Sequence, residues 1–249
     1  MADSPKVHFE ILGNTGIITL SNPPGNELIQ PDFISVAQLT EWTQIPGVNG
    51  LIITGAGRNF SSGARLDDIF SMASDKEFLI QKMDAGKAVL DALENLDLPV
   101  IALINGICFG GGLEIALACH IRVCSENALF AFPEINHQLM PGLGGSIRLR
   151  DIIGESQALS VLLSGDTLNA EEALKLKLVD HCRPKAEVLD FATSLMAKMV
   201  EGKPKKVVQS VVRSWHNSRN LSYSEALKEE TRLFYELAKD ELQRRESNS

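Results

Sequence analysis

Three glycines followed closely by a glutamate form the stretch of this sequence best suited to chemistry. The glycines occupy residues 110–112, Glu114 follows them, and the apolar run 98–103 before them predicts a buried strand. Glycines where a strand passes into a helix let a ligand approach the backbone, because no Cβ stands in the way. The first N–H groups of such a helix lack intrahelical partners and suit an anionic oxygen. An oxygen-binding backbone beside a carboxyl group is the beginning of an active site.

A second loop of small residues, 61–64, follows another expected buried strand at 51–54. Together with residues 110–112 it can present two N–H groups to one carbonyl oxygen, which is the arrangement of an oxyanion hole. A second carboxyl group, that of Glu134, adjoins a further glycine-rich turn. Paired carboxyl groups can divide general acid and general base work when their environments set suitable pKa values. These residues alone favour an enzyme and a plain binding protein about equally.

The elements that must position these loops alternate between strand and helix in the first half of the chain, which predicts a parallel α/β sheet. In order, we expect strands at 7–12 and 16–20 joined as a hairpin, a helix at 31–42, a strand at 51–54, and a long helix from a capping box at Ser74 and Glu77 to Asn95.

The second half of the chain is mostly helical beyond the glycine-rich stretch. We expect strands at 120–124 and 128–131, helices through Arg150, at 154–163 and at 169–176, a short strand at 178–181, and helices from residue 185 onward. Capping boxes are predicted at Asn169 with Glu172 and at Ser222 with Glu225. The polar end, residues 243–249, is expected to fray.

Composition excludes several classes of protein. The 249 residues are 44% hydrophobic, and 24 basic against 32 acidic residues leave a net charge of -8, which disfavours nucleic-acid binding. No apolar run is long enough to span a membrane, and the N-terminus has no signal-peptide pattern. We therefore expect a soluble cytoplasmic protein that binds no membrane.

Neither the cysteines nor the histidines are spaced as metal ligands. The four cysteines lack CxxC spacing and read as reduced packing residues, so no metal site is predicted. The five histidines are scattered, and His137 alone stands in a loop near the expected site.

Four segments in order carry a family resemblance: residues 60–66 (FSSGARL), 106–114 (GICFGGGLE), 132–134 (FPE) and 141–145 (PGLGG). Together they resemble the enoyl-CoA hydratase/isomerase (crotonase) superfamily, and the similarity runs from about residue 7 to residue 240. The resemblance implies an α/β fold, a crotonase-like spiral of ββα units over residues 1–184 that carries the site. It also implies a helical C-terminal subdomain, 185–249, that forms homotrimers or dimers of trimers.

By the same resemblance, the N–H groups of Ala64 and Gly111 hold a thioester carbonyl oxygen, while Glu114 and Glu134 are the catalytic residues that manage a water molecule. No cofactor is implied beyond the coenzyme A of the substrate itself. The family pattern also implies a set of residues that contact coenzyme A or the acyl chain: Ser62, Leu66, Ile69, Phe70, Gly110, Leu113, Phe132, Pro141 and Gly142.

The resemblance thus implies a lyase of fatty acid metabolism that hydrates a 2-enoyl-CoA thioester to a 3-hydroxyacyl-CoA through an enolate-like transition state. Which glutamate is the acid and which the base stays open. The alternatives are an enoyl-CoA isomerase, another enolate-forming enzyme such as a hydrolase or decarboxylase, or a non-catalytic acyl-thioester-binding protein. Arg65 stands where the family commonly has aspartate, so an acyl-carrier-protein thioester is a further alternative substrate.

Overall fold

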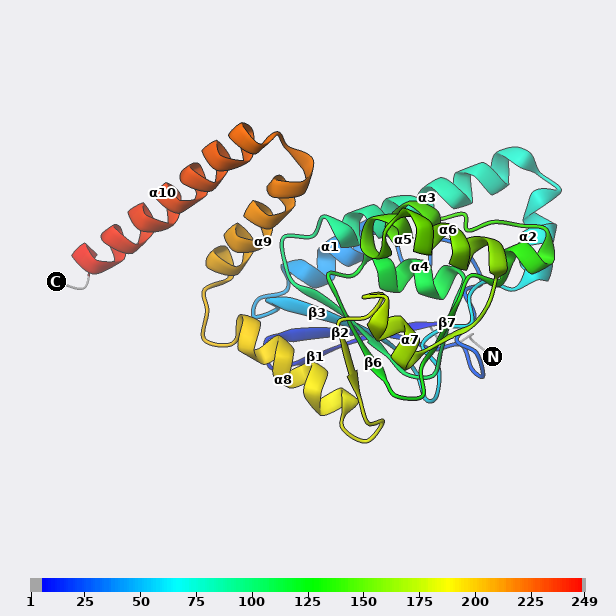
Figure 1. The fold of residues 1–249 in the computed structure, drawn as a ribbon. Coiled ribbons are helices and arrows are strands. Elements are labelled where there is room, and N and C mark those ends of the chain that lie inside the picture. The colour runs from blue at the N-terminus through cyan, green and yellow to red at the C-terminus, as the bar shows by residue number, and fades with distance from the viewer. Residues whose placement is uncertain (1–5, 248–249) are drawn as a thin grey trace, which may run out of the picture.

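A computed structural model describes residues 6–247 of the chain, which fold around a six-stranded sheet (Figure 1). Its strand order is β1-β2-β3-β4-β6-β9; β1 runs antiparallel to β2 and every other neighbouring pair is parallel. The strands are β1 (Val7–Leu12), β2 (Thr15–Leu20), β3 (Gly50–Gly55), β4 (Val100–Ile104), β6 (Ile121–Ser125) and β9 (His181–Arg183).

A smaller sheet brings the two small-residue loops together. It consists of β5 (Ile107–Phe109), β7 (Leu129–Ala131) and β8 (Leu168–Asn169). Ser61 forms a parallel bridge with Cys108 of β5, and the N–H of Phe109 donates to the Ser61 carbonyl at 2.9 Å. The loop at 61–64 therefore lies beside the strand that leads into the glycines.

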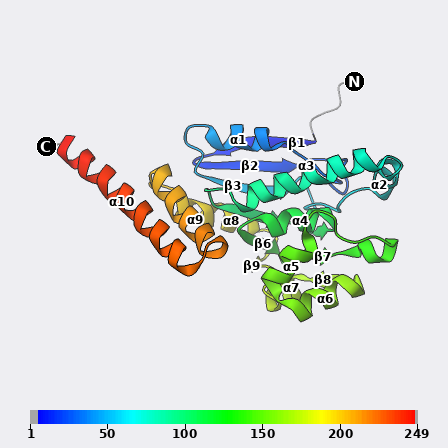
Figure 2. The same cartoon turned by 90° about the horizontal axis from the view of Figure 1, so that it is seen from above.

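Helices cover both faces of the large sheet, as Figures 1 and 2 show. The helices of the described residues are α1 (Val36–Gln44), α2 (Leu66–Ala73), α3 (Lys76–Glu94), α4 (Gly111–Ala118), the 3-10 helix η1 (Pro133–His137), α5 (Gly145–Ile153), α6 (Glu155–Ser164), α7 (Ala170–Lys175), α8 (Val188–Val200), α9 (Lys205–Asn220) and α10 (Tyr223–Ser247).

The two faces of the sheet belong to two apolar cores, because side chains alternate along a strand. In β3, Leu51 and Ile53 pack in the core formed with α1, α3 and α4, whereas Ile52 packs with Ala192 and Met196 of α8. Helix α8 thus completes the packing of the large sheet, although the domain boundary expected from the sequence falls just before it, at residue 184. Helix α9 follows α8, and α10 packs against α9 and leads away from the body (Figure 2).

Several helix ends differ from those predicted. Helix α1 begins at Val36 and not at residue 31, because the Ser35 side chain caps it by accepting the N–H of Gln38 at 3.0 Å. The cap of α3 is Asp75, which accepts the N–H of Phe78 at 3.1 Å, and not Ser74.

Both capping boxes predicted for the second half are confirmed, at Asn169 with Glu172 and at Ser222 with Glu225. The expectation of a frayed end is wrong for residues 243–247. Helix α10 continues there, and Glu241 pairs with arginines three and four residues further on. Residues 248 and 249 lie outside the described part.

Candidate active site

The loop at 61–64 and the start of α4 pack so closely that glycine is required between them. Gly63 has φ +86°, and a Cβ there would lie 2.9 Å from the Phe109 carbonyl oxygen and 3.3 Å from the Gly111 nitrogen. Ala64 follows Gly63, and both Ala64 and Gly111 line one cavity. Among the hydrogen bonds of residues 6–247, none uses the N–H of Ala64 or of Gly111. Two donors at this cavity are thus left for a ligand oxygen.

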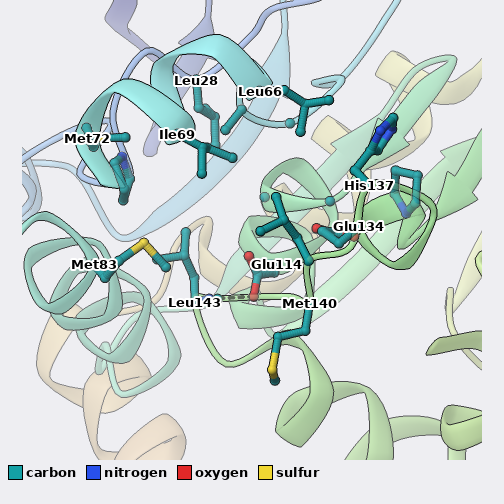
Figure 3. Close-up of a pocket in the computed structure, with 18 of the residues that line it drawn as sticks. Leu28, Leu66, Ile69, Met72, Met83, Glu114, Glu134, His137, Met140 and Leu143 are labelled. Atoms are coloured by element: carbon teal, nitrogen blue, oxygen red, sulfur yellow. Dashed lines mark hydrogen bonds between the residues drawn. The ribbon is translucent and has the colours of Figure 1, made fainter. Parts of the chain in front are cut away.

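The cavity has a volume of about 310 Å³ and lies between the two loops, helices α2 and α3, and the segment after η1 (Figure 3). Glu114, Glu134 and His137 bring ionisable groups to it. Most of its wall is apolar and is formed by Leu28, Ile29, Pro31, Leu66, Ile69, Met72, Leu79, Met83, Leu139, Met140 and Leu143.

Glu114 lies on the first turn of α4 and is 2% exposed. Its Oε1 atom accepts two backbone hydrogen bonds, from Leu143 N at 2.7 Å and from Gly145 N at 2.8 Å. Burial raises the pKa of this carboxyl group, since the ionised form loses water, while the two N–H donors and the charge of Arg148 act in the opposite direction. The protein therefore excludes water from this carboxyl group, while two backbone N–H groups stabilise one of its oxygens.

Glu134 reaches the cavity from η1, just after β7, and stands beside Glu114 in Figure 3. A Cβ on Gly110 would lie 2.7 Å from Glu134 Oε1, so the glycine leaves room for this carboxyl group. Glu134 Oε2 is buried and, in the described part of the chain, has no hydrogen-bond partner. The pKa of Glu134 is raised to about 7, chiefly because burial removes water from the ionised form; its own backbone N–H acts against this rise, and the nearby Glu114 charge adds to it. Glu134 thus titrates near neutrality.

The structure brings most of the expected site residues to this cavity. Those that line it are Ser62, Ala64, Leu66, Ile69, Gly110, Gly111, Glu114, Glu134 and Gly142.

Four expected contact residues do not line it, for separate reasons. Phe70 follows Ile69 on α2 and, because adjacent helical residues face different directions, is 54% exposed. Leu113 and Phe132 are each 1% exposed in the core, and the Phe132 ring packs behind Gly145, where a Cβ would lie 2.8 Å from it. Pro141 is buried beside the cavity-lining Gly142.

The sequence interpretation missed the methionines of the wall. Met83 projects from α3 towards Gly142, whose absent side chain makes room for it; a Cβ there would lie 2.2 Å from Met83 Cε. Met72 lines the cavity from α2 and Met140 from the segment after η1, where Met140 is 71% exposed. A signal for them existed, since methionine fills irregular apolar surfaces that accept flexible ligands.

Comparison with known proteins decides the family. The family model described as enoyl-CoA hydratase/isomerase matches residues 11–248. The chain belongs to this family. A protein named probable enoyl-CoA hydratase from Bacillus subtilis (strain 168) is 33% identical over 227 residues, which cover 90% of this chain and 87% of that protein.

Two further proteins that resemble this chain extend the comparison. The fatty acid oxidation complex subunit alpha of Idiomarina loihiensis is 38% identical over 187 residues, or 73% of this chain but only 25% of that longer protein. A crystal structure of enoyl-CoA hydratase subunit I from Geobacillus kaustophilus HTA426 has a TM-score of 0.84 at 30% identity and covers 96% of this chain and 92% of its own. The crotonase fold expected from the sequence is confirmed.

Two other features are absent from residues 6–247. No helix in that range is long and apolar enough to cross a membrane. Within the same range, no three His, Cys, Asp or Glu side chains gather as metal ligands would.

Proposed function

We propose that this protein hydrates a 2-enoyl-CoA thioester to a 3-hydroxyacyl-CoA. The observation that carries the proposal is the pair of carboxyl groups, the buried Glu114 and the half-buried Glu134, at one cavity with two unused backbone donors. A reaction that adds the two parts of water across a double bond needs one group to remove a proton and another to supply one. Two carboxyl groups with different environments meet that need.

The backbone donors act on the thioester. With its carbonyl oxygen between the N–H groups of Ala64 and Gly111, the thioester is polarised and Cβ of the conjugated double bond becomes electrophilic. The same donors stabilise the negative charge that grows on the oxygen as the enolate-like transition state forms. Because the donors are fixed backbone groups, little reorganisation is needed during the reaction.

The environments of the two glutamates assign their roles within this proposal. Burial raises the pKa of Glu114, but two N–H donors fixed on Oε1 stabilise its ionised form, and we assign to it the role of the base that takes a proton from water. Glu134 has an unpartnered oxygen and a pKa of about 7, so it still carries a proton near neutrality and supplies Cα. The water oxygen then bonds to Cβ, and a proton returns from Glu114 to Glu134 through solvent before the next turnover.

The apolar wall indicates the acyl group. Leucine, isoleucine and methionine side chains surround the carboxyl groups, which suits a hydrocarbon chain. We further propose that residues 185–249 form the trimer contact. Helices α9 and α10 support this, since they leave Trp215, Tyr223, Phe234 and Tyr235 exposed, and exposed aromatic groups are typical of interfaces.

The test is the loss of conjugated-enoyl absorbance when the protein is mixed with crotonyl-CoA. We expect that Glu114→Gln and Glu134→Gln each slow it strongly, because glutamine keeps the shape but cannot exchange the proton. Glu126→Gln, on the exposed turn after β6, serves as the matched control and should react as the wild type does. If both active-site variants hydrate at the wild-type rate, the proposed mechanism is wrong.

A further inference from the structure

The Glu114 carboxyl group takes both of its hydrogen bonds from one short turn, residues 142–145. Leu143 N and Gly145 N donate to the same oxygen, at 2.7 Å and 2.8 Å. Three consecutive peptide groups make up this turn. The Leu143 N–H belongs to the first, which joins residues 142 and 143, and the Gly145 N–H belongs to the third, which joins residues 144 and 145. The second, which joins Leu143 to Gly144, carries a buried carbonyl that needs a partner of its own.

Arg148 is that partner. Its Nη1 atom donates to the Leu143 carbonyl at 2.8 Å, and the side chain is only 10% exposed. Gly144 is left-handed, with φ +93°, and a Cβ there would lie 2.7 Å from Arg148 Nη1. The backbone N–H of Arg148 also donates to the Gly144 carbonyl at 3.0 Å. The guanidinium group is thus packed against the 142–145 turn.

The other two sides of the guanidinium group are bound to helix α3. Nε donates to Glu94 Oε2 at 2.7 Å, and Nη2 donates to Asp91 Oδ1 at 2.6 Å. The planar fork of an arginine can serve three partners in fixed directions, whereas a lysine ammonium group is a single point charge on a flexible stem. One side chain therefore joins the 142–145 turn to a helix that forms part of the cavity wall.

We propose that Arg148 is a positioning residue: it fixes the 142–145 turn against α3, so that both N–H groups stay aimed at Glu114. Arg148 does not line the cavity and makes no contact with the reacting atoms. Only the expected effect on kcat rests on the proposed function. The hydrogen bonds of Arg148 and their effect on the Glu114 carboxyl group are properties of the free protein.

Three ionisable groups face the Glu114 carboxyl group. Arg148 on α5 and Lys87 on α3 both lower its pKa, against the larger effect of burial. Glu134 on η1 is neutral while it holds its proton; when it ionises, the two carboxylates repel each other, which raises the pKa of Glu134. Without Arg148, Glu114 loses both a nearby positive charge and the fixed direction of its two donors, so its pKa should rise further.

The test compares Arg148→Gln and Arg148→Lys with a matched control, Arg150→Gln. Arg150 lies two residues away on the same helix, is exposed and pairs only with the exposed Asp151 among the described residues. Two measurements are made on each purified full-length protein: kcat and KM with crotonyl-CoA, and the infrared titration of the Glu114 carboxyl group, assigned by difference from Glu114→Gln.

In Arg148→Gln we expect kcat to fall about tenfold to a hundredfold, because a small displacement of a catalytic group lowers the rate by factors of this size. KM should change less than about threefold. Glu114 should titrate at a higher pH than in the wild type. Arg148→Lys should show a smaller change in both quantities, because it keeps the charge and loses the fork. Arg150→Gln should match the wild type.

The inference is overturned if folded Arg148→Gln keeps the wild-type titration of Glu114, whatever happens to kcat, because a purely structural role would leave that titration in place. If Arg148→Gln does not fold, the same comparison is made with Arg148→Lys, and a wild-type titration there overturns it equally. A wild type that hydrates no enoyl thioester would overturn the proposed function alone, because the titration needs no substrate.

Discussion

Replacing Glu134 by glutamine should stabilise the protein in alkaline solution while it removes activity. Burial raises the pKa of Glu134 to about 7 in the folded protein, from 4.5 for an unperturbed carboxyl group. Between these two values the unfolded chain has released its proton and the folded protein still holds it. Folding stability therefore falls as the pH rises from 4.5 to 7, and the full cost of ionising the buried group persists above pH 7.

The size of the effect follows from the two pKa values. Their difference of roughly 2.5 units corresponds to about 3 kcal/mol at pH 8.5, but to only about 1 kcal/mol at pH 5. Glutamine has nearly the same shape and never ionises, so Glu134→Gln avoids this cost. We expect the variant to exceed the wild type in free energy of unfolding by up to about 3 kcal/mol at pH 8.5, and by much less at pH 5.

Urea unfolding followed by circular dichroism at the two pH values, at one protein concentration, measures this difference. Glu126→Gln is the control, because its side chain is exposed on the turn after β6 and should show no pH-dependent gain. If the gain in free energy of unfolding of Glu134→Gln over the wild type is no larger at pH 8.5 than at pH 5, the reasoning that burial keeps Glu134 protonated is refuted.

Three further predictions concern other parts of the molecule. Gly145→Ala should lower kcat at least about tenfold in a crotonyl-CoA assay, since its Cβ would lie 2.8 Å from Glu114 Cγ and displace the base; an unchanged kcat would contradict the close packing. Burial and nearby cations lower the pKa of His120 from 6.5 to about 4, so the unfolded chain binds a proton there at a higher pH than the folded protein does. The free energy of unfolding should therefore drop by roughly 3 kcal/mol between pH 7 and pH 4. Thermal unfolding of His120→Gln should show a smaller drop over the same pH range. Met83→Trp should narrow the apolar end of the cavity and lower kcat/KM for long-chain enoyl-CoA substrates much more than for crotonyl-CoA, which a substrate panel would show.

Local patterns in the sequence predicted most of the fold, because periodicity and caps are local properties. The hairpin, the buried strands and the long helix α3 all follow from residues within a few positions of one another. The early start predicted for α1 was wrong because Ser35 caps the helix and because the chain before it makes a distant contact. Leu28 forms a bridge with Ala64, and the Leu28 N–H donates to the Gly63 carbonyl at 2.9 Å, while residues 29–31 form a bend before α1. No nearby residue signals that pairing.

The residues of the candidate site likewise fall into those that the sequence predicted and those that it could not predict. The glycine-rich loops and the two glutamates could be selected from sequence, because their residue types are unusual and their order matches a family. The apolar wall could not, since Ile69 lines the cavity and Phe70 does not, although both are apolar neighbours on one helix. The partners of Arg148 were equally hidden, because Asp91 and Glu94 lie more than fifty positions away along the chain.

The most direct test of the account is the mass of the product formed from crotonyl-CoA in ordinary water and in water enriched in oxygen-18. Hydration predicts a product heavier than the substrate by one water, with the heavy oxygen incorporated once and retained on the acyl chain after the thioester is cleaved. It also predicts that this product disappears in Glu134→Gln. A product of unchanged mass, or free coenzyme A with no hydrated intermediate, would contradict the central claim that Glu114 and Glu134 together add water to an enoyl thioester.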